Sequence, residues 1–387
     1  MSSRLEKYMR MVISAEQPVS GLAPSLIRGC LGGMAGLYDA GLETYLAAEK
    51  VGLRRRDRLP VPVLSIGNLS VGGTGKTPMT AMICQRLSAD GKRLAILSRG
   101  HGGTSVAARF VSDGSGEIFL SAEEAGDEPV LLAQECPHTP VLVGKDRRLS
   151  GREALRRLTL DAFVLDDGFQ FWQLFRDLDI VLLDASRPFD NGYPLPRGLL
   201  REPARHLQRA GVVVVTRSDL LGSNGREKLR QEIGRYARDI EVFFARHAPS
   251  NFVSVGSPTT GPVPVTNWHG VRCVAISGIA QPDSFHRTLN GVGIEVVAEL
   301  IRSDHHKFVE ADIIEAQKAA KDTSADAIIM TRKDAVKWPA DSSHDGVPAY
   351  ALHIEMQVED ESRFLAIVRT TLFGSSQASS VLEIAGN

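Results

Sequence analysis

The chain has 387 residues, 43% hydrophobic and 24% charged, a balance that is ordinary for a globular protein. Its formal net charge of -1 at pH 7 gives no bulk field to attract nucleic acid, so no nucleic-acid partner is expected. The cysteines, at positions 30, 84, 136 and 273, form no CxxC pair, which argues for reduced thiols and against a disulfide framework or a zinc site.

The N-terminal part, residues 1–58, combines an apolar helical pattern with a basic cluster. Apolar residues recur at helical spacing between positions 22 and 53, and Arg54, Arg55, Arg56 and Arg58 follow. Such a segment predicts either an amphipathic helix in an anionic lipid interface or a helix that packs on the core with its charges in water. The sequence contains no run of about 18 or more uncharged apolar residues, so no membrane-spanning helix is expected.

Short apolar runs then alternate with helical patterns. Strands are expected at residues 61–66, 93–97, 140–143, 162–165, 179–183, 212–215, 242–244, 272–276, 327–330 and 350–354. Continuous β-branched runs indicate strands buried on both faces, which is typical of an α/β fold with a largely parallel sheet flanked by helices. A Ser/Pro/Thr/Gly-rich stretch near 249–264 predicts a boundary between a core over residues 59–250 and a smaller C-terminal α/β domain over 251–374, followed by a loose tail over 375–387.

A glycine-rich loop after the first strand carries the strongest chemical signal. Residues 67–78 read GNLSVGGTGKTP between a strand and a helix, a P-loop NTPase-like context in which backbone N–H groups and a helix N-terminus bind polyphosphate. Lys76 is expected to reach the β- and γ-phosphates of ATP, and the Thr77 hydroxyl to ligate Mg²⁺. The candidate nucleotide-binding residues are Asn68, Ser70, Val71, Gly72, Gly73, Thr74, Gly75, Lys76 and Thr77. Ser70 stands where the general pattern has glycine.

Carboxylates follow a later strand, where a P-loop protein holds its magnesium shell. Asp166 and Asp167 lie in the middle of the segment FVLDDGFQ (163–170), directly after its apolar run, and either one alone is also a plausible strand cap. Asp127 and Glu128 lie in a turn ahead of a helix, where the residues by themselves favour a helix cap over a general base. Arg201 follows a proline-braced loop suited to present positive charge to a phosphoryl group, or else lies in water.

These motifs, in this order, resemble one family, the tetraacyldisaccharide 4′-kinases of Gram-negative lipid A biosynthesis. The resemblance covers the N-terminal helix, the phosphate loop and further blocks, which read SRGHGG (98–103), GDEP (126–129), VGKDR (143–147), LDDGFQ (165–170), LPRGLLREP (195–203), SGIA (277–280), DHHKF (304–308) and TRKDAVK (331–337). Ser70 is normal within this family.

The resemblance implies transfer of the γ-phosphoryl of ATP to the 4′-hydroxyl of a tetraacyl glucosamine disaccharide 1-phosphate. It implies Asp127 as general base, assisted by His305 rather than His306, and this overrides the helix-cap interpretation. Arg201 is expected to stabilise charge, and Asp166 and Asp167 to act with Mg²⁺, without deciding which of them touches the ion. Glu128 is a further candidate ligand, and Gln170 and Glu202 are supporting polar groups.

The resemblance also favours the lipid-interface reading of the N-terminal helix, since a tetraacylated substrate is anchored in a bilayer. The expected location is the cytoplasmic face of the inner membrane, as a peripheral protein with no obligate protein partner. Departures from the family pattern are His101 for tyrosine, Arg197 and Leu199 for a small residue and a proline, and Arg332 for glutamate.

Two other functions remain open from the residues alone. One is a nucleotide-dependent switch or metallochaperone, since TRSD (216–219) and TRKD (331–334) loosely match the base-reading motifs of GTPases. The other is a soluble kinase for a small metabolite.

Overall fold

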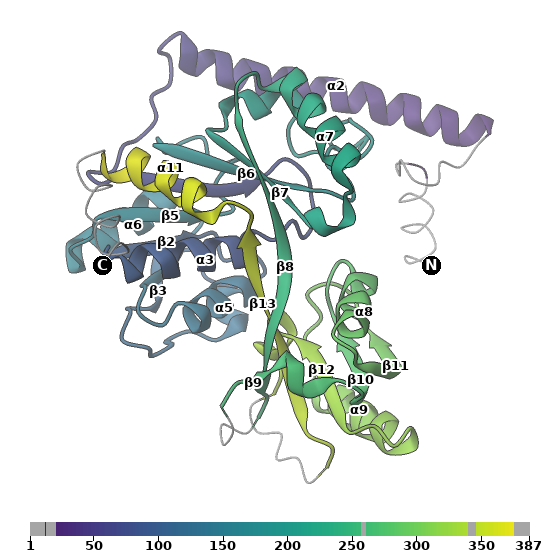
Figure 1. Ribbon diagram of the computed structural model, residues 1–387. Helices are drawn as coiled ribbons and strands as arrows, with labels where there is room; N and C mark the ends of the chain where they lie inside the picture. Colours follow the sequence, from purple (N-terminus) through teal and green to yellow (C-terminus); the bar gives the residue numbers. More distant parts are fainter. Residues whose placement is uncertain (1–11, 13–20, 257–260, 340–345, 375–387) are drawn as a thin grey trace. The chain divides into compact units, whose positions relative to one another are not determined.

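The computed structural model describes residue 12 and residues 21–256, 261–339 and 346–374 (Figure 1). The chain divides into two compact units, each built from separated stretches of sequence. Unit 1 comprises Met1–Lys76, Ala162–Arg246 and Val358–Asn387, and unit 2 comprises Thr77–Asp161 and His247–Gln357. The domain limits expected from the sequence stay predictions, and the tail expected over residues 375–387 lies outside the described residues.

Unit 1 contains a parallel sheet in the order β5-β1-β6-β7-β8. Its strands are β1 (Val63–Asn68), β5 (Ala162–Asp166), β6 (Leu178–Asp184), β7 (Val212–Thr216) and the first part of β8 (Glu241–Ser254). The first four are buried along their whole length, as their continuous apolar sequences require. Because Ile66 pairs with Asp166, the ends of β1 and β5 that carry the phosphate loop and the aspartates lie side by side.

Two helices cover opposite faces of the unit 1 sheet. On one face Leu229 and Ile233 of α7 (Ser223–Tyr236) pack in a buried cluster that includes Phe244. On the other face Phe364 of α11 (Glu361–Phe373) contacts the ring of Phe243, at a centroid distance of 5.3 Å. Successive side chains of β8 point to opposite faces, so neighbouring phenylalanines serve both layers.

Unit 2 contains two groups of strands. In one, β2 (Leu94–Ser98) pairs in parallel with β4 (Val141–Val143), which pairs antiparallel with β3 (Arg109–Ser112). Helices α5 (Asp127–Glu135) and α6 (Arg147–Arg157) contact these strands. Helix α3 (Lys76–Ala89) comes before β2 in the chain, and the short α4 (Ala122–Ala125) comes directly before α5.

The second group of strands in unit 2 is parallel, in the order β11-β10-β12-β13. The strands are β10 (Arg272–Ser277), β11 (Glu295–Ile301), β12 (Ala327–Thr331) and β13 (Ala349–Val358), and β9 (Val263–Pro264) pairs with the later part of β8. Side chains of α9 (Glu310–Asp322) pack with Val274 and Ile276 of β10, whereas those of α8 (Pro282–Gly291) pack with Cys273 and Ala275. The two helices therefore cover opposite faces. The short α10 (Arg332–Ala335) follows β12 directly.

The mixed α/β fold with a mostly parallel arrangement of strands is confirmed, and all ten strands expected from the sequence are present. The sequence analysis missed β3, β9 and β11. β11 is half exposed along its length, and β3 and β9 have only four and two residues, so none produces the long buried apolar run that marks the other strands.

Helix α2 (Leu22–Lys50), the long helix drawn in purple in Figure 1, carries two apolar stripes. One is buried in unit 1 and consists of Leu31, Ala35, Leu42 and Leu46. The other is exposed and includes Leu22, Leu26, Met34 and Leu37. Neither α2 nor any other helix among the described residues is long and apolar enough to cross a membrane.

We predict that Gly67→Ala destabilises the protein. A Cβ at Gly67 would lie 2.5 Å from Cβ of Phe169, which is fully buried and cannot move aside. Overpacking of this kind costs about 1–3 kcal/mol, which chemical denaturation measures as a lower free energy of unfolding. Gly73→Ala is the matched control in the same segment, because a Cβ there meets nothing within 4 Å. Equal stability of the two variants would contradict the prediction.

Candidate active site

The phosphate loop is held open by contacts at its base. The buried amide of Asn68 donates to the Thr74 hydroxyl at 2.9 Å, and the Thr216 hydroxyl donates to the Thr74 carbonyl at 3.0 Å. Gly72 and Gly75 have φ of 125° and 88°, a region that favours glycine. The side chains of Asn68 and Thr216 therefore fix the loop in a conformation whose backbone can approach a phosphate closely.

Asp167 joins the loop to an arginine. Its carboxylate lies 3.7 Å from Nζ of Lys76, and Nη1 of Arg201 donates to its two oxygens at 2.9 and 2.8 Å. Asp167 has a φ of 53°, in the left-handed region that non-glycine residues rarely adopt and that is often found at functional sites. Asp166, the last residue of β5, is buried beside it. Unit 1 thus brings Lys76, Asp166, Asp167 and Arg201 together.

The chain before Arg201 pairs with the phosphate loop through its backbone. Val71 N–H donates to the Leu199 carbonyl at 2.8 Å, and Arg201 N–H donates to the Leu69 carbonyl at 2.6 Å. Leu199, a departure from the family pattern, makes this contact through its main chain and does not disturb it. Arg197, the other departure here, stacks over the ring of Tyr193 with its guanidinium 4.7 Å from the centroid.

Glu202 is fully buried next to Arg201 and has three partners within unit 1. Its Oε1 accepts from Gln170 Nε2 at 3.1 Å, and its Oε2 meets His206 Nδ1 at 2.8 Å and Arg209 Nη2 at 2.5 Å. The same Gln170 amide donates to the Asn68 carbonyl at 2.9 Å. Gln170 therefore links the buried Glu202 to the start of the phosphate loop, through the Asn68 carbonyl.

On unit 2, Asp127 is the first residue of α5 and is 5% exposed. Its Oδ2 lies 3.0 Å from Nδ1 of His305, which has a φ of 60°. The N-terminal cap of α5 is Gly126 with no side-chain cap bond, so Asp127 is not a capping residue. His306 points elsewhere, with its Nε2 3.0 Å from Asp312 Oδ2. Of the two adjacent histidines, His305 is the one that contacts Asp127.

Two lysines complete the surroundings of Asp127, and the sequence analysis gave them no role. Nζ of Lys333 and Nζ of Lys337 lie 3.8 and 3.7 Å from Asp127 Oδ2. Lys333 also lies 3.5 Å from Glu128 Oε1 and 3.8 Å from Asp304 Oδ1. The only available signal was their place in the TRKDAVK block, four residues apart.

Electrostatics keep this pair charged. Burial raises the pKa of Asp127, but the hydrogen bond from His305 and the charges of Lys333 and Lys337 outweigh it, so the pKa is lowered. The hydrogen bond to Asp127 raises the pKa of His305, against burial and the nearby charge of Lys333. The arrangement stabilises an ionised carboxylate beside a histidine that holds its proton more strongly than usual.

Asp334 holds together three blocks that are far apart in the sequence, namely SGIA (277–280), DHHKF (304–308) and TRKDAVK (331–337). It is fully buried, and its carboxylate accepts from Gly278 N–H at 3.1 Å and the Thr331 hydroxyl at 2.7 Å and lies 3.2 Å from Lys337 Nζ. Gly278 in turn accepts from His305 N–H at 3.2 Å through its carbonyl. The aspartate of TRKD thus has a structural role in positioning His305 and Lys337, which speaks against its reading a nucleotide base.

A family model described as Tetraacyldisaccharide-1-P 4'-kinase matches residues 28–372. The chain belongs to this family. It is 44% identical over 308 residues to a tetraacyldisaccharide 4'-kinase of Anaeromyxobacter sp. (strain Fw109-5), covering 78% of this chain and 80% of that protein. It is 40% identical over 354 residues to one of Geobacter sulfurreducens, covering 91% and 95%.

A solved structure of LpxK from Aquifex aeolicus in complex with ATP has the same fold. The TM-score is 0.72 at 28% identity, and the match covers 90% of this chain and all of that one. The family resemblance inferred from the ordered motifs is therefore confirmed, and the chain belongs to a family of kinases.

The remaining departures from the kinase pattern are accommodated within unit 2. Arg332 Nε lies 3.0 Å from Glu135 Oε1, and the other oxygen of Glu135 lies 2.9 Å from His353 Nε2. This triad borders a pocket of about 250 Å³ at the first turn of α3, beside Thr77 and with Met82 and Leu352 among its walls. The ring of His101 packs edge-on against that of His305, at 5.8 Å between centroids.

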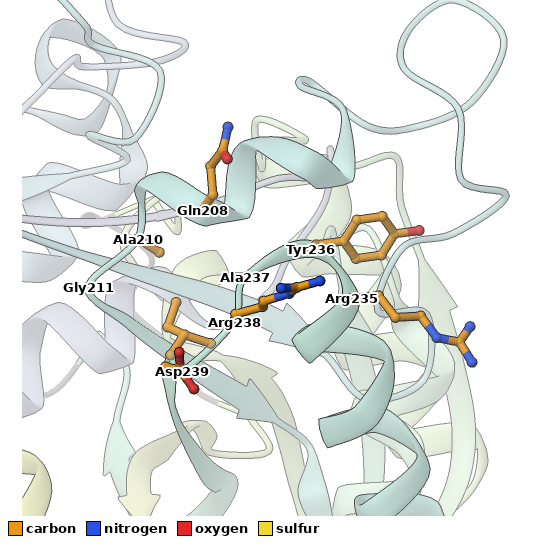
Figure 2. A pocket seen from close by; sticks show the side chains of 9 residues that line it. Gln208, Ala210, Gly211, Arg235, Tyr236, Ala237, Arg238 and Asp239 are labelled. Carbon is orange, nitrogen blue, oxygen red and sulfur yellow. The ribbon is translucent and has the colours of Figure 1, made fainter.

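A larger, open hollow of about 470 Å³ lies elsewhere in unit 1, beyond the end of α7 (Figure 2). It is lined by Gln208, Tyr236, Arg238 and neighbouring residues, and none of the motif residues takes part. It therefore does not belong to the kinase site.

The oxygen donors present suit Mg²⁺. In unit 1, the carboxylates of Asp166 and Asp167 are hard oxygen donors of the kind that this ion takes. In unit 2, the hydroxyl of Thr77 and the carboxylate of Glu128 are donors of the same kind. No cluster of three or more His, Cys, Asp or Glu side chains with metal-site geometry occurs in the described parts of the chain. Kinase sites typically complete the Mg²⁺ shell with phosphate and water oxygens, so one or two protein carboxylates are sufficient.

We predict that Asp127→Asn lowers the pKa of His305. The carboxylate is the largest cause of the upward shift, and without it burial and the charge of Lys333 are opposed only by the charge of Asp304, so the pKa falls from its raised value. Titration of the His305 imidazole by NMR measures this. The control is Glu123→Gln, an exposed carboxylate of unit 2 that pairs with Lys307 and should leave His305 unchanged. A His305 pKa that does not fall in Asp127→Asn would show that the two groups are not coupled.

Proposed function

We propose that this chain transfers the γ-phosphoryl group of ATP to the 4′-hydroxyl of a tetraacyl glucosamine disaccharide 1-phosphate, which yields the 4′-phosphorylated lipid A precursor. Membership of the kinase family supports the reaction, and the ATP complex of the Aquifex LpxK supports the donor. The observation that carries the mechanism is the contact of the buried Asp127 with the partly exposed His305, since a kinase for an alcohol needs a positioned proton acceptor.

On the donor side, the phosphate loop binds the triphosphate through its backbone and Lys76. Arg201 and Lys76 share Asp167 as a partner, so their positive charges are fixed in direction before nucleotide binds. Such preorganised charges stabilise the negative charge that spreads over the transferring phosphoryl group. When bound, Mg²⁺ supplies further neutralisation of phosphate charge, held by Thr77 and one or both of Asp166 and Asp167, with Glu128 as an additional candidate.

On the acceptor side, Asp127 accepts the proton of the 4′-hydroxyl as the oxygen attacks the γ-phosphorus. His305 donates to the carboxylate through Nδ1 and holds it in one orientation. Lys333 and Lys337 keep the carboxylate ionised, so that it is available as an acceptor at neutral pH. The γ-phosphorus–oxygen bond to the β-phosphate breaks, and ADP leaves.

We further propose that α2 docks on the inner leaflet, at the cytoplasmic face of the inner membrane. Its exposed leucines, Leu22, Leu26 and Leu37, are 82%, 63% and 76% accessible, and an acyl-chain interface would cover such side chains. The basic cluster contributes less than its sequence suggests. Arg54 stacks on Tyr45, Arg56 pairs with Glu49 and Arg58 pairs with Asp177.

The first test is phosphate transfer from labelled ATP to a detergent-solubilised tetraacyl disaccharide 1-phosphate. We expect wild type to form the 4′-phosphorylated product. We expect Asp127→Asn to lose about 10²- to 10⁴-fold in kcat, the usual contribution of general-base catalysis, because the amide cannot accept the proton. Lys76→Ala should also be severely impaired, whereas the control Glu123→Gln should match wild type.

One outcome would contradict this function, and another would contradict only its mechanism. Folded wild type that forms no product but slowly hydrolyses GTP would favour the nucleotide switch. Full activity of Asp127→Asn would leave the kinase assignment intact but remove Asp127 as its base.

For the membrane, we predict that the double variant Leu26→Gln, Leu37→Gln binds phosphatidylglycerol-containing vesicles at least about tenfold more weakly than wild type. Burial of a leucine side chain contributes roughly 1.5–3 kcal/mol, and glutamine forfeits most of it. Vesicle sedimentation gives the partition constants. The control is Val309→Gln, Ile314→Gln, which removes equally exposed apolar side chains from unit 2. If both double variants bind as wild type does, α2 is not the docking element.

A further inference from the structure

Helix α2 is joined to the arginine of the phosphoryl-transfer site by a connected set of hydrogen bonds, all within unit 1. We propose that Tyr38 and Glu43 of α2 are positioning residues that hold Arg201 and Glu202 in their working conformation. This inference rests on the kinase function proposed above. It assigns a catalytic consequence to a helix whose role there is only to meet lipid.

The first connection runs from Tyr38 to the main chain of Arg201. The phenol donates to the Arg201 carbonyl at 2.7 Å. Burial and the neighbouring Glu202 raise the pKa of Tyr38, so the phenol keeps the proton that it donates. Arg201 is also tied at its N–H to Leu69 of the phosphate-loop segment. Its backbone is therefore held on both sides, by α2 and by the loop it serves.

The second connection runs from Glu43 through His206 to Glu202. Glu43 Oε1 lies 2.9 Å from His206 Nε2, and His206 Nδ1 lies 2.8 Å from Glu202 Oε2. His206 is 2% exposed and Glu202 is fully buried, whereas the Glu43 side chain is 48% exposed, so the imidazole joins a carboxylate at the surface to one in the interior. Glu202 then reaches Gln170, which hydrogen-bonds Arg201 Nη1 at 3.3 Å.

A third contact is weaker. Arg205 bonds Asp39 and Glu43, but its side chain and that of Glu43 are 47% and 48% exposed. Solvent-exposed ion pairs of this kind contribute little. The coupling therefore depends on the bond from Tyr38 to a backbone carbonyl and on the Glu43–His206–Glu202 bonds, which pass through a buried imidazole to a buried carboxylate.

The first connection ends on Arg201, and the second ends on Glu202, which reaches Arg201 through Gln170 and also contacts the phosphate-loop segment through the same amide. Loss of either connection frees the Arg201 side chain to leave Asp167. The Arg201 guanidinium, which stabilises the charge of the transition state, is then correctly placed in only a fraction of the enzyme–substrate complexes. The expected signature is a lower kcat with unchanged KM for ATP, since an interaction made only in the transition state affects kcat and kcat/KM equally.

The experiment measures kcat and KM in detergent with saturating lipid acceptor, so that membrane docking does not contribute. We expect Tyr38→Phe and Glu43→Ala each to lower kcat roughly three- to tenfold, in line with loss of one hydrogen bond. Glu43→Gln keeps an oxygen to accept from His206 and should recover most of the loss. Thr44→Ala is the control on the same helix, because its hydroxyl bonds only Ala40 within α2.

A double-mutant cycle distinguishes positioning from a general structural role. In the Arg201→Ala background, Tyr38→Phe and Glu43→Ala should have no further effect on kcat, because they act through the missing guanidinium. Multiplicative losses in that background, or a raised KM with unchanged kcat, would overturn the inference. If the wild-type protein makes no phosphorylated lipid, the kinase function itself is refuted. If the wild type is active but the α2 variants lower kcat in the Arg201→Ala background as much as they do in the wild type, only the role of α2 is refuted.

Discussion

A fully buried carboxylate, Glu202, is the constraint around which unit 1 is arranged. An ion in the protein interior costs several kcal/mol unless its lone pairs are satisfied. Gln170, His206 and Arg209 provide that satisfaction, and each comes from a different position along the chain. Their positions are therefore not independent. The segment after β5, the chain after Arg201 and helix α2 must all adopt the conformation in which Glu202 is neutralised.

Unit 2 also buries a carboxylate, that of Asp127, but here the positive groups around the carboxylate are in excess. Asp127 has a histidine and two lysines within 4 Å of one oxygen, so positive groups exceed the buried negative one. Asp334 restores the balance by pairing with Lys337 while it binds the backbone of Gly278. The candidate base is thus set in a network in which every member has a structural partner, which restricts the geometries open to it.

The parts of the site that are local in sequence were predictable. The phosphate loop is contiguous between a strand and a helix, and Asp166 and Asp167 end the neighbouring strand, so strand order alone brings them together. Asp127 and His305 are 178 positions apart, and no spacing rule joins them. The residues alone favoured a helix cap for Asp127, and only the resemblance connected the pair. Lys333 and Lys337 were missed because two lysines four positions apart, one in the short α10 and one just after it, give no signal in the sequence of what they face.

Helix α2 shows a different limit. Its apolar positions were read as one broad face that either packs on the core or meets lipid. The structure divides them, with Leu31, Leu42 and Leu46 buried and Leu26, Met34 and Leu37 exposed. Helical periodicity identifies an apolar arc but not how much of it a neighbour covers. Helical periodicity also does not show that the hydroxyl of Tyr38, which lies within that arc, donates a hydrogen bond to the Arg201 carbonyl.

The lowered pKa of Asp127 is compatible with the proposed role of this residue as base once the nature of the transition state is considered. In a loose transition state the bond from the attacking oxygen to phosphorus is barely formed, so the hydroxyl needs orientation before it needs deprotonation. A carboxylate that stays ionised throughout the neutral range accepts that hydrogen bond at every encounter. As the bond to phosphorus forms, the oxygen becomes strongly acidic, and even a weak base then takes its proton. The neutral Asp127 that results lies among His305, Lys333 and Lys337, whose charges favour its ionised form. The proton is therefore released readily, and the same charges that weaken the base restore it for the next turnover.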